Sequence, residues 1–122
     1  MNQAKKSSSN RVRCSHILLK HTQSRRPFDS YRNKKVTRSK DEAMNEIQQI
    51  LTYLQTEGTK NFAQIAVEKS ECSSAANGGD LGDFGRGEMQ QAFENAAFAL
   101  SVNGLSGIVD SDSGLHIILR TG

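Results

Sequence analysis

The strongest candidates for acid–base or nucleophilic chemistry in this 122-residue chain are His16, His116 and Cys72. His16 and His116 lie in the apolar runs RVRCSHILLK and LHIILR, which are typical of strands covered on at least one face. Because side chains alternate along a strand, His16 shares a face with Cys14 and Leu18. If the two strands are neighbours in a suitable register, both imidazoles emerge side by side. Otherwise each histidine has its own separate backbone partner.

Cys72 stands in SECSSA, between an expected helix and a glycine-rich stretch. A thiol beside imidazoles has an altered ionisation, and a Cys with two His also suggests a cysteine hydrolase. The alternative is a small buried apolar side chain, and we assign Cys14 to that class. Two cysteines fit neither a disulfide scaffold nor a zinc site, which needs about four ligands. We therefore expect reduced thiols, no metal and no cofactor.

Lys20, Arg25 and Arg26, here called the basic triad, stand in KHTQSRRPF without an acidic residue among them. Residues 1–40 hold 12 of the 16 Lys and Arg residues and one acid, so the two parts of the chain carry +11 and −8. Such asymmetry favours an anionic partner for the N-terminal part: nucleic acid, a membrane surface or a phosphate. The alternative is a solvated basic tail and loop, and we favour it for Lys5, Lys6, Lys34 and Lys35.

Leu81, Met89 and Phe93 are close enough in the sequence to form a small apolar pocket, although such stripes more often belong to a core. The nearby GGDLGDFGRG lacks the lysine and the hydroxyl that a nucleotide-binding loop requires. Its glycines are interpreted as turn formers.

The strands that would carry these residues are predicted at residues 11–20, about 81–84, 108–110 and 115–119. The last two, joined by the turn SDSG, read as a terminal β-hairpin. Residues 115–119 are apolar on both faces except at His116, which indicates a central strand. The polar residues 21–38 are predicted to form a long loop, and long loops in small domains are often functional.

Three helices are predicted between these strands. SKDEAMNEIQQILTYLQTEG contains a capping box, Ser39 followed by Glu42, and Gly58 suits the position after its last turn. NFAQIAVEKSE predicts a shorter helix with Asn61 as its cap, and a third helix is expected at about residues 88–100. The order β, α, α, short β, α, β, β predicts an α+β domain with helices packed on a small, mostly antiparallel sheet.

The domain organisation follows from length and composition. Residues 1–10 are polar and rich in serine, so we expect a flexible tail, and residues 11–122 suffice for a single domain. No segment is apolar for long enough to cross a bilayer or to act as a signal. We therefore expect a soluble monomer of the cytoplasm or nucleus, with no membrane partner.

Three separated blocks resemble, in order and spacing, the parvulin family of peptidyl-prolyl cis/trans isomerases: VRCSHILLKHTQSRRPF, ECSSAANGGDLGDFGRGEMQQAFENAAFAL and DSGLHIILRTG. More narrowly they resemble the Pin-type parvulins, which act on phospho-Ser/Thr-Pro bonds. The resemblance runs from about Arg11 to the C-terminus. It implies a four-stranded antiparallel sheet with about four helices, no cofactor, and phosphorylated Ser/Thr-Pro proteins as partners.

The resemblance also implies a role for each candidate residue. It makes His16 and His116 the paired histidines at the base of the site, with Ser111 as their neighbour. Cys72 would be the active-site cysteine and Ser113 the active-site hydroxyl. The proline ring would lie in a pocket formed by Leu81, Met89 and Phe93 and lined by Gln90, and the phosphate would be bound by Lys20, Arg25 and Arg26. Parvulins without a phosphate preference lack this triad.

The sequence departs from the Pin-type pattern in three places. It contains no tryptophan, and we expect no WW domain, the phosphopeptide-binding module that many Pin-type enzymes carry. Gln91-Ala92 stands where relatives often have Lys-Pro, so the pocket rim is expected to differ. Ile108 replaces a frequent proline, which we expect to matter little.

Three other functions compete with isomerisation. A phosphopeptide-binding module needs the basic triad but neither the histidines nor Cys72. A nucleic-acid binder would use the basic N-terminal third, but only Phe28 and Tyr31 are aromatic there, and we expect no nucleic-acid partner. A cysteine hydrolase would use Cys72 as a nucleophile. We favour a non-covalent role for this residue, because rotation about a bond needs no nucleophile.

Overall fold

The computed structural model describes residues 10–122, so the predicted tail lies outside the described residues except for Asn10. The centre of the fold is a four-stranded antiparallel sheet in the order β4-β1-β6-β5. Its strands are β1 (Arg11–Leu19), β4 (Asp80–Gly85), β5 (Val109–Ser111) and β6 (Gly114–Arg120). The predicted α+β class, the terminal hairpin and the central position of the last strand are therefore confirmed.

The helices are α2 (Lys40–Glu57), α3 (Phe62–Lys69), α4 (Gln91–Ala99) and a 3-10 helix, η1 (Ser73–Asn77). The described residues thus contain three α-helices and one 3-10 helix, where the family resemblance implied about four helices. The predicted loop 21–38 also contains a small two-stranded sheet, formed by β2 (Phe28–Asp29) and β3 (Lys34–Lys35).

Helix α2 begins and ends where its sequence signals predict. The Ser39 side chain accepts a hydrogen bond from the Glu42 backbone, and the Glu42 carboxylate accepts one from the Ser39 backbone. These two bonds satisfy amides that otherwise have no partner at a helix start. At the other end Gly58 has a positive φ of 88°, a conformation that glycine adopts without steric cost.

Two predictions about the other helices are wrong. Asn61 precedes α3 but its side chain does not cap it; instead its amide donates to the Tyr53 hydroxyl on α2. Helix α4 begins at Gln91 rather than near residue 88, because Glu88 belongs to the preceding turn. There the Glu88 carboxylate accepts from the Gly85 amide and pairs with Arg11.

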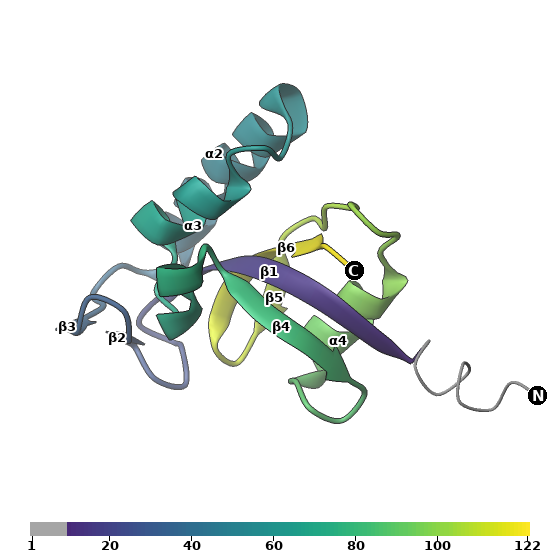
Figure 1. Ribbon diagram of the computed structural model, residues 1–122. Coiled ribbons are helices and arrows are strands. Elements are labelled where there is room, and N and C mark those ends of the chain that lie inside the picture. The colour runs from purple at the N-terminus through teal and green to yellow at the C-terminus, as the bar shows by residue number, and fades with distance from the viewer. Residues whose placement is uncertain (1–9) are drawn as a thin grey trace, which may run out of the picture.

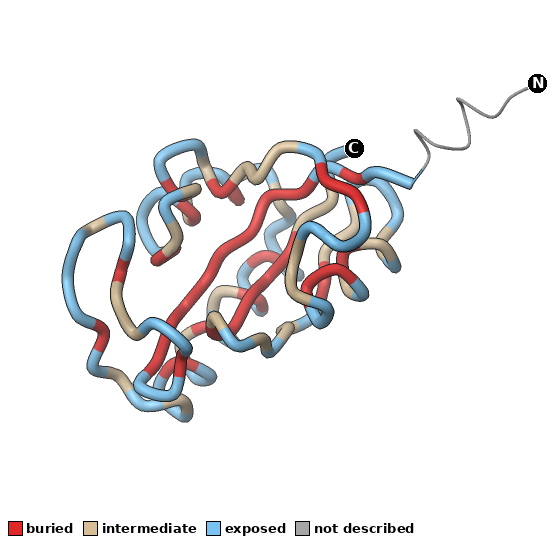
Figure 2. The backbone as a smooth tube through the Cα atoms, turned by 90° about the horizontal axis from the view of Figure 1, so that it is seen from below, coloured by how far each residue is buried: buried red, intermediate tan, exposed pale blue. Residues whose placement is uncertain are grey.

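The two faces of the sheet are covered by different helices (Figure 1). Helices α2 and α3 pack on one face, where they bury an apolar cluster with Ile17, Leu19, Leu115 and Ile117. Helix α4 packs on the other face, against Val12, Cys14, Phe84 and Ile118. Most residues of β1 and β6 are buried (Figure 2). None of the helices within residues 10–122 is long and apolar enough to cross a membrane.

Gly79 lets the chain approach β1 closely just before β4 begins. Its carbonyl accepts a hydrogen bond from the His16 amide at 2.9 Å. A Cβ atom at Gly79 would lie 2.3 Å from the His16 carbonyl oxygen, and its φ is +86°. Only glycine fits this position without displacing β1, so Gly79 fixes β4 beside the strand that carries His16.

Candidate active site

His16 on β1 and His116 on β6 lie side by side on the face covered by α4. In the β1–β6 register His16 opposes Ile118 and Leu18 opposes His116, so the two histidines are diagonal neighbours. Their Nδ1 atoms are 3.0 Å apart, and their rings are stacked with centroids 5.2 Å apart. The side-by-side arrangement that strand alternation allowed is therefore confirmed.

Both imidazoles are held in the neutral form. Burial lowers the pKa of His16 to about 4, and burial together with the charge of His16 lowers the pKa of His116 to about 3. In the contact between the two Nδ1 atoms, one neutral ring donates and the other accepts. The Nε2 atom of His116 forms a further hydrogen bond with the Ser111 hydroxyl at 2.6 Å. The pair is thus a neutral hydrogen-bonded unit, without a charge of its own near pH 7.

An apolar cavity of about 190 Å³ opens beside the histidines. Its lining combines every candidate outside the basic triad with Leu18: His16, Leu18, Cys72, Leu81, Met89, Gln90, Phe93, Ser111, Ser113 and His116. We call it the apolar cavity. These residues come from β1, the start of η1, β4, α4 and the terminal hairpin, so segments far apart in the sequence meet at this point.

Phe93 forms the wall of the apolar cavity nearest the histidines. Its ring is only 4% exposed and meets His116 edge-to-face at 5.1 Å and His16 at 5.5 Å. Leu81 lies in β4 and Met89 in the turn before α4, and both pack on the same cluster while remaining half-buried. Leu81, Met89 and Phe93 therefore line a pocket, and Phe93 also belongs to the core, so both interpretations of these residues apply.

The two cysteines have different surroundings. Cys72 is half-buried and lines the apolar cavity at the position that precedes η1. Cys14 is fully buried among Val12, Phe84 and Ile118, and burial raises its pKa to about 11. The prediction that Cys14 is a packing residue agrees with this position.

Gln90 connects the start of α4 to the turn between β5 and β6. Its amide nitrogen donates to the Ser113 hydroxyl at 2.7 Å, and its amide oxygen accepts from the Asp112 backbone at 3.1 Å. The Ser113 amide in turn donates to the Ser111 hydroxyl at 3.2 Å. These bonds hold the two serines at the rim of the apolar cavity.

The basic triad lines a second depression of about 330 Å³. Its lining residues are Lys20, Arg25, Arg26 and Ser113, so Ser113 is a shared wall between this depression and the apolar cavity. The loop that carries the two arginines is held toward the hairpin, because the Arg25 amide donates to the Asp112 carbonyl at 2.7 Å. The structure therefore brings together the two groups of residues that the sequence keeps apart.

The three cations differ in exposure. Arg25 and Arg26 are exposed, and the Arg26 guanidinium lies over the Phe28 ring at 5.5 Å. Lys20 is only 7% exposed, and its ammonium donates to the Phe28 carbonyl at 2.6 Å. Burial lowers the pKa of Lys20, and the charge of Arg26 lowers it further, whereas Cys72, Glu71 and Asp29 raise it. Within residues 10–122 none of the three cations forms an ion pair.

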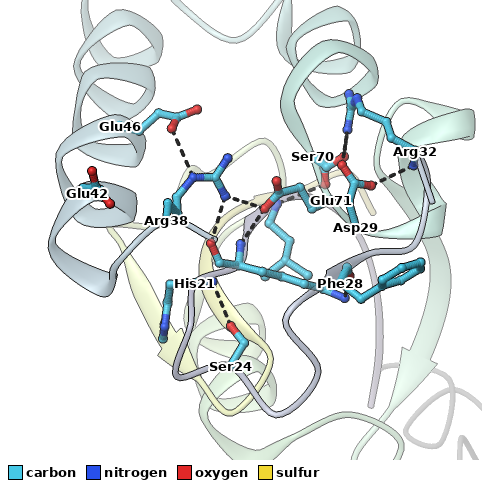
Figure 3. Close-up of polar contacts among 12 residues, drawn as sticks. His21, Ser24, Phe28, Asp29, Arg32, Arg38, Glu42, Glu46, Ser70 and Glu71 are labelled. Carbon is cyan, nitrogen blue, oxygen red and sulfur yellow. Dashed lines mark hydrogen bonds and ion pairs between the residues drawn. The ribbon is translucent and has the colours of Figure 1, made fainter. Parts of the chain in front are cut away.

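Beneath the basic triad lies a polar network that sequence reasoning missed (Figure 3). It joins two buried carboxylates, Asp29 and Glu71, to the side chains of Arg32 and Arg38. The only sequence signal was the position of Glu71, directly before Cys72. Charged residues in polar segments are usually solvated, so no pattern indicated that these would be buried.

Outside the apolar cavity and the basic triad, the described residues offer little else that could hold a ligand of this kind. Residues 10–122 contain no cluster of three or more His, Cys, Asp or Glu side chains that could hold a metal ion. A larger depression of about 400 Å³ lies between α2 and α3, but no His or Cys is among its lining residues. The paired histidines and Cys72 instead line the apolar cavity on the α4 face.

Comparison with known proteins identifies the family. Residues 1–121 match the family described as PPIC-type PPIASE domain. The chain is 52% identical over 113 residues to peptidyl-prolyl cis-trans isomerase ESS1 of Saccharomyces cerevisiae, covering 92% of this chain and 66% of that protein. It is 57% identical over 110 residues to the putative peptidyl-prolyl cis-trans isomerase dodo of Drosophila melanogaster, covering 89% of this chain and 64% of that protein. The chain thus spans slightly less than two thirds of the length of these two relatives.

A solved structure extends the likeness to three dimensions. Peptidyl-prolyl isomerase ESS1 from Candida albicans aligns with a TM-score of 0.88 at 36% sequence identity, over 99% of this chain and 73% of that one. The sequence resemblance, the sheet order and the arrangement of the site agree with these matches. The chain belongs to the parvulin, or PPIC-type, family of peptidyl-prolyl cis/trans isomerases.

Proposed function

We propose that this chain accelerates cis/trans isomerisation of phospho-Ser/Thr-Pro bonds in phosphoproteins, and that it does so without a covalent intermediate. One observation carries the proposal: the apolar cavity and the basic triad adjoin at Ser113. A proline ring in the first and the preceding phosphate in the second would place the bond between them at this shared wall. The named relatives, described as peptidyl-prolyl cis-trans isomerases, support the same activity.

The reaction is a rotation, and this sets what the site must do. An X-Pro bond favours trans by only about 0.5–1 kcal/mol but isomerises over tens to hundreds of seconds, because the barrier is about 18–20 kcal/mol. No covalent bond breaks. A catalyst must favour the twisted amide, in which the carbonyl oxygen carries less negative charge and the nitrogen is more basic.

Binding at two points can be converted into this twist. The apolar side chains of Leu81, Met89 and Phe93 would hold the proline ring, while the residue before it rotates. Arg25 and Arg26 offer forked donors to phosphoryl oxygens, and Lys20 adds a point charge. With both ends held, binding energy is available to stabilise the rotated state in preference to either planar one.

The polar residues beside the cavity would tune the rotating amide. Because both histidines are neutral, they place no cation near the carbonyl oxygen, which would stabilise the planar form. The electron-rich sulfur of Cys72 would act in the same direction, by disfavouring negative charge on that oxygen. The His16–His116–Ser111 hydrogen bonds keep this wall of the cavity in place.

Exchange spectroscopy on two short peptides tests the proposal. A Ser-Pro peptide and its phosphorylated counterpart differ only in the phosphate, and we expect accelerated exchange with a strong preference for the phosphopeptide. Arg25→Ala together with Arg26→Ala should remove most of that preference, about 100-fold or more, since hydrogen bonds to charged groups contribute about 1.5–3 kcal/mol each. The matched control is Lys34→Ala with Lys35→Ala, which removes the same charge from exposed positions on β3.

The outcomes separate the competing functions. A protein that binds the phosphopeptide without accelerating exchange would be a binding module. Equal rates for both peptides would leave the isomerase activity and remove the phosphate preference. Cleavage of the peptides would favour the hydrolase.

Partners and compartment follow the same proposal. The partners would be phosphorylated Ser/Thr-Pro proteins, and the compartment would be the cytoplasm or nucleus, where Cys72 stays reduced. Both cysteines are free thiols in the structure, which fits a reducing compartment.

A further inference from the structure

Two buried carboxylates lie close to the ammonium that would meet the phosphate. Asp29 is 1% exposed and Glu71 is 5% exposed, and the charges of both act on Lys20. A carboxylate that paired with Lys20 would neutralise it and would repel a bound phosphate. The structure must therefore occupy both carboxylates with other partners if Lys20 is to serve an anion.

Asp29 is occupied locally. One of its oxygens accepts from the Tyr31 and Arg32 amides at 2.9 and 2.8 Å, and the other accepts from the Arg32 guanidinium at 3.1 Å. The same guanidinium donates to the carbonyls of Ser70 and Val67. Backbone donors alone would hold the Asp29 carboxylate within its own turn.

Glu71 depends on a more distant partner. Its Oε1 atom accepts from the Lys20 amide at 2.7 Å and from the Arg38 guanidinium at 2.6 Å. Its Oε2 atom has no hydrogen-bond donor among residues 10–122. Figure 3 shows Arg38 reaching across from the end of the loop to Glu71, with Glu46 on its other side. Arg38 is thus the only cation in direct contact with this carboxylate within the described residues.

Arg38 is well suited to hold this carboxylate. Burial lowers its pKa, but the hydrogen bond and the charge of Glu71 more than compensate, so its pKa lies above the ordinary value and it stays cationic. The same guanidinium nitrogen donates to the Lys20 carbonyl at 2.8 Å, and the Arg38 carbonyl accepts from the Thr22 amide. Arg38 therefore closes the base of the loop and neutralises Glu71 at one point.

We propose that Arg38 is a positioning residue for phosphate recognition: by holding Glu71, it keeps that carboxylate from pairing with Lys20 and leaves the Lys20 charge for the phosphate. This inference rests on the proposed function of the basic triad. Without Arg38, the Glu71 carboxylate loses its only ion-pair partner within the described residues, while its charge still acts on the Lys20 ammonium. Opposite charges in a poorly solvated setting attract strongly, so Glu71 would turn to Lys20.

A charge-rescue experiment tests this role. Arg38→Gln removes the guanidinium, and the double variant Arg38→Gln with Glu71→Gln removes both charges while an amide oxygen can still accept from the Lys20 backbone. The matched control is Lys35→Gln, which removes one positive charge from an exposed position near the network. The readout is the ratio of kcat/KM for the phosphorylated and unphosphorylated Ser-Pro peptides.

We expect Arg38→Gln to lower the ratio by about tenfold or more, and the double variant to restore it to within about threefold of the wild type. Lys35→Gln should leave the ratio unchanged. An unchanged ratio in Arg38→Gln would overturn the proposal. So would a folded double variant that is not rescued, because Arg38 would then act only by closing the loop. If Arg38→Gln does not fold, a folded double variant whose ratio is lowered by about tenfold or more would still overturn the proposal.

A second readout separates this inference from the proposed function. The pKa of the Lys20 ammonium, followed by NMR with carbon-labelled lysine, should rise in Arg38→Gln and return toward the wild-type value in the double variant. This titration needs neither turnover nor phosphopeptide. A wild type without isomerase activity would therefore refute the proposed function, whereas a Lys20 pKa that is the same in all three proteins would refute the role of Arg38.

Discussion

The two faces of the central sheet are formed by the same strands but bury different kinds of side chain. The face covered by α2 and α3 buries a large cluster of apolar side chains, among them Ile47, Leu54, Leu115 and Ile117. The face covered by α4 also buries apolar side chains, but it includes His16 and His116 and leaves the apolar cavity open beside them. Ile117 and Ile118 are adjacent on β6, but their side chains lie on opposite faces of the sheet.

This difference indicates a division between stability and chemistry. Burying a polar group is unfavourable unless it is hydrogen-bonded, and an open cavity forfeits packing contacts. The α4 face accepts both, whereas no histidine belongs to the apolar cluster beneath α2 and α3. We infer that the packed face supplies the stability that allows the other face to keep two neutral histidines and an unfilled pocket.

The largest effect that should separate the faces is a response to acid. The folded-state pKa values of His16 and His116 are lowered to about 4 and about 3, below the ordinary value of 6.5. Between pH 6.5 and these lowered pKa values, the unfolded chain binds more protons than the folded chain. The stability contributed by the neutral histidines is therefore fully present above about pH 6.5 and falls as the pH decreases toward 4. The loss approaches about 1.4 kcal/mol per pH unit for each histidine.

Urea denaturation between pH 7.5 and pH 4.5 measures this loss. His116→Asn should reduce the slope of unfolding free energy against pH by about one proton. His21, whose pKa is also lowered by burial, contributes equally to the wild type and the variant and cancels in the comparison. A slope that His116→Asn leaves unchanged would show that the paired histidines are not the acid-sensitive element.

A smaller effect should come from shortening the two neighbouring isoleucines. Both side chains are fully buried, so Ile117→Ala and Ile118→Ala should each reduce the unfolding free energy by about 2–5 kcal/mol. Only Ile118→Ala should also lower kcat/KM of the folded protein, because Ile118 opposes His16 in the β1–β6 register. Denaturation curves and exchange rates, corrected for the folded fraction, test this pair. Equal losses of activity in both variants would contradict the division between the faces.

The same contrast explains how far the sequence was informative. Helix α2 and the terminal hairpin were predicted closely because their signals are local: a capping box at Ser39, a glycine at position 58 and a short turn. Strand alternation placed each histidine on a face, but the register that brings them together depends on long-range pairing. The family resemblance, rather than periodicity, assigned roles to Cys72 and the basic triad.

Where prediction failed, a distant partner decided the structure. Asn61 has the residue type of a helix cap, yet its amide bonds to Tyr53 on another helix. The start of α4 is shifted because Glu88 bonds to Gly85 and Arg11. Arg38 and Glu71 are 33 positions apart in the sequence, and nothing local to either residue indicates a buried pair.

The smallest expected effect concerns Cys72, and it tests whether the α4 face works by a field or by a covalent bond. Cys72→Asp keeps an electron-rich group beside the rotating carbonyl, whereas Cys72→Ala removes it. We expect Cys72→Asp to retain substantial turnover and Cys72→Ala to fall below it, with a difference of about tenfold, or about 1.4 kcal/mol in the barrier. Cys14→Ala is the matched control, since its thiol is buried in the core and lies outside the apolar cavity. A folded Cys72→Asp protein without activity would favour nucleophilic attack by the thiol, because a carboxylate would then fail to replace it.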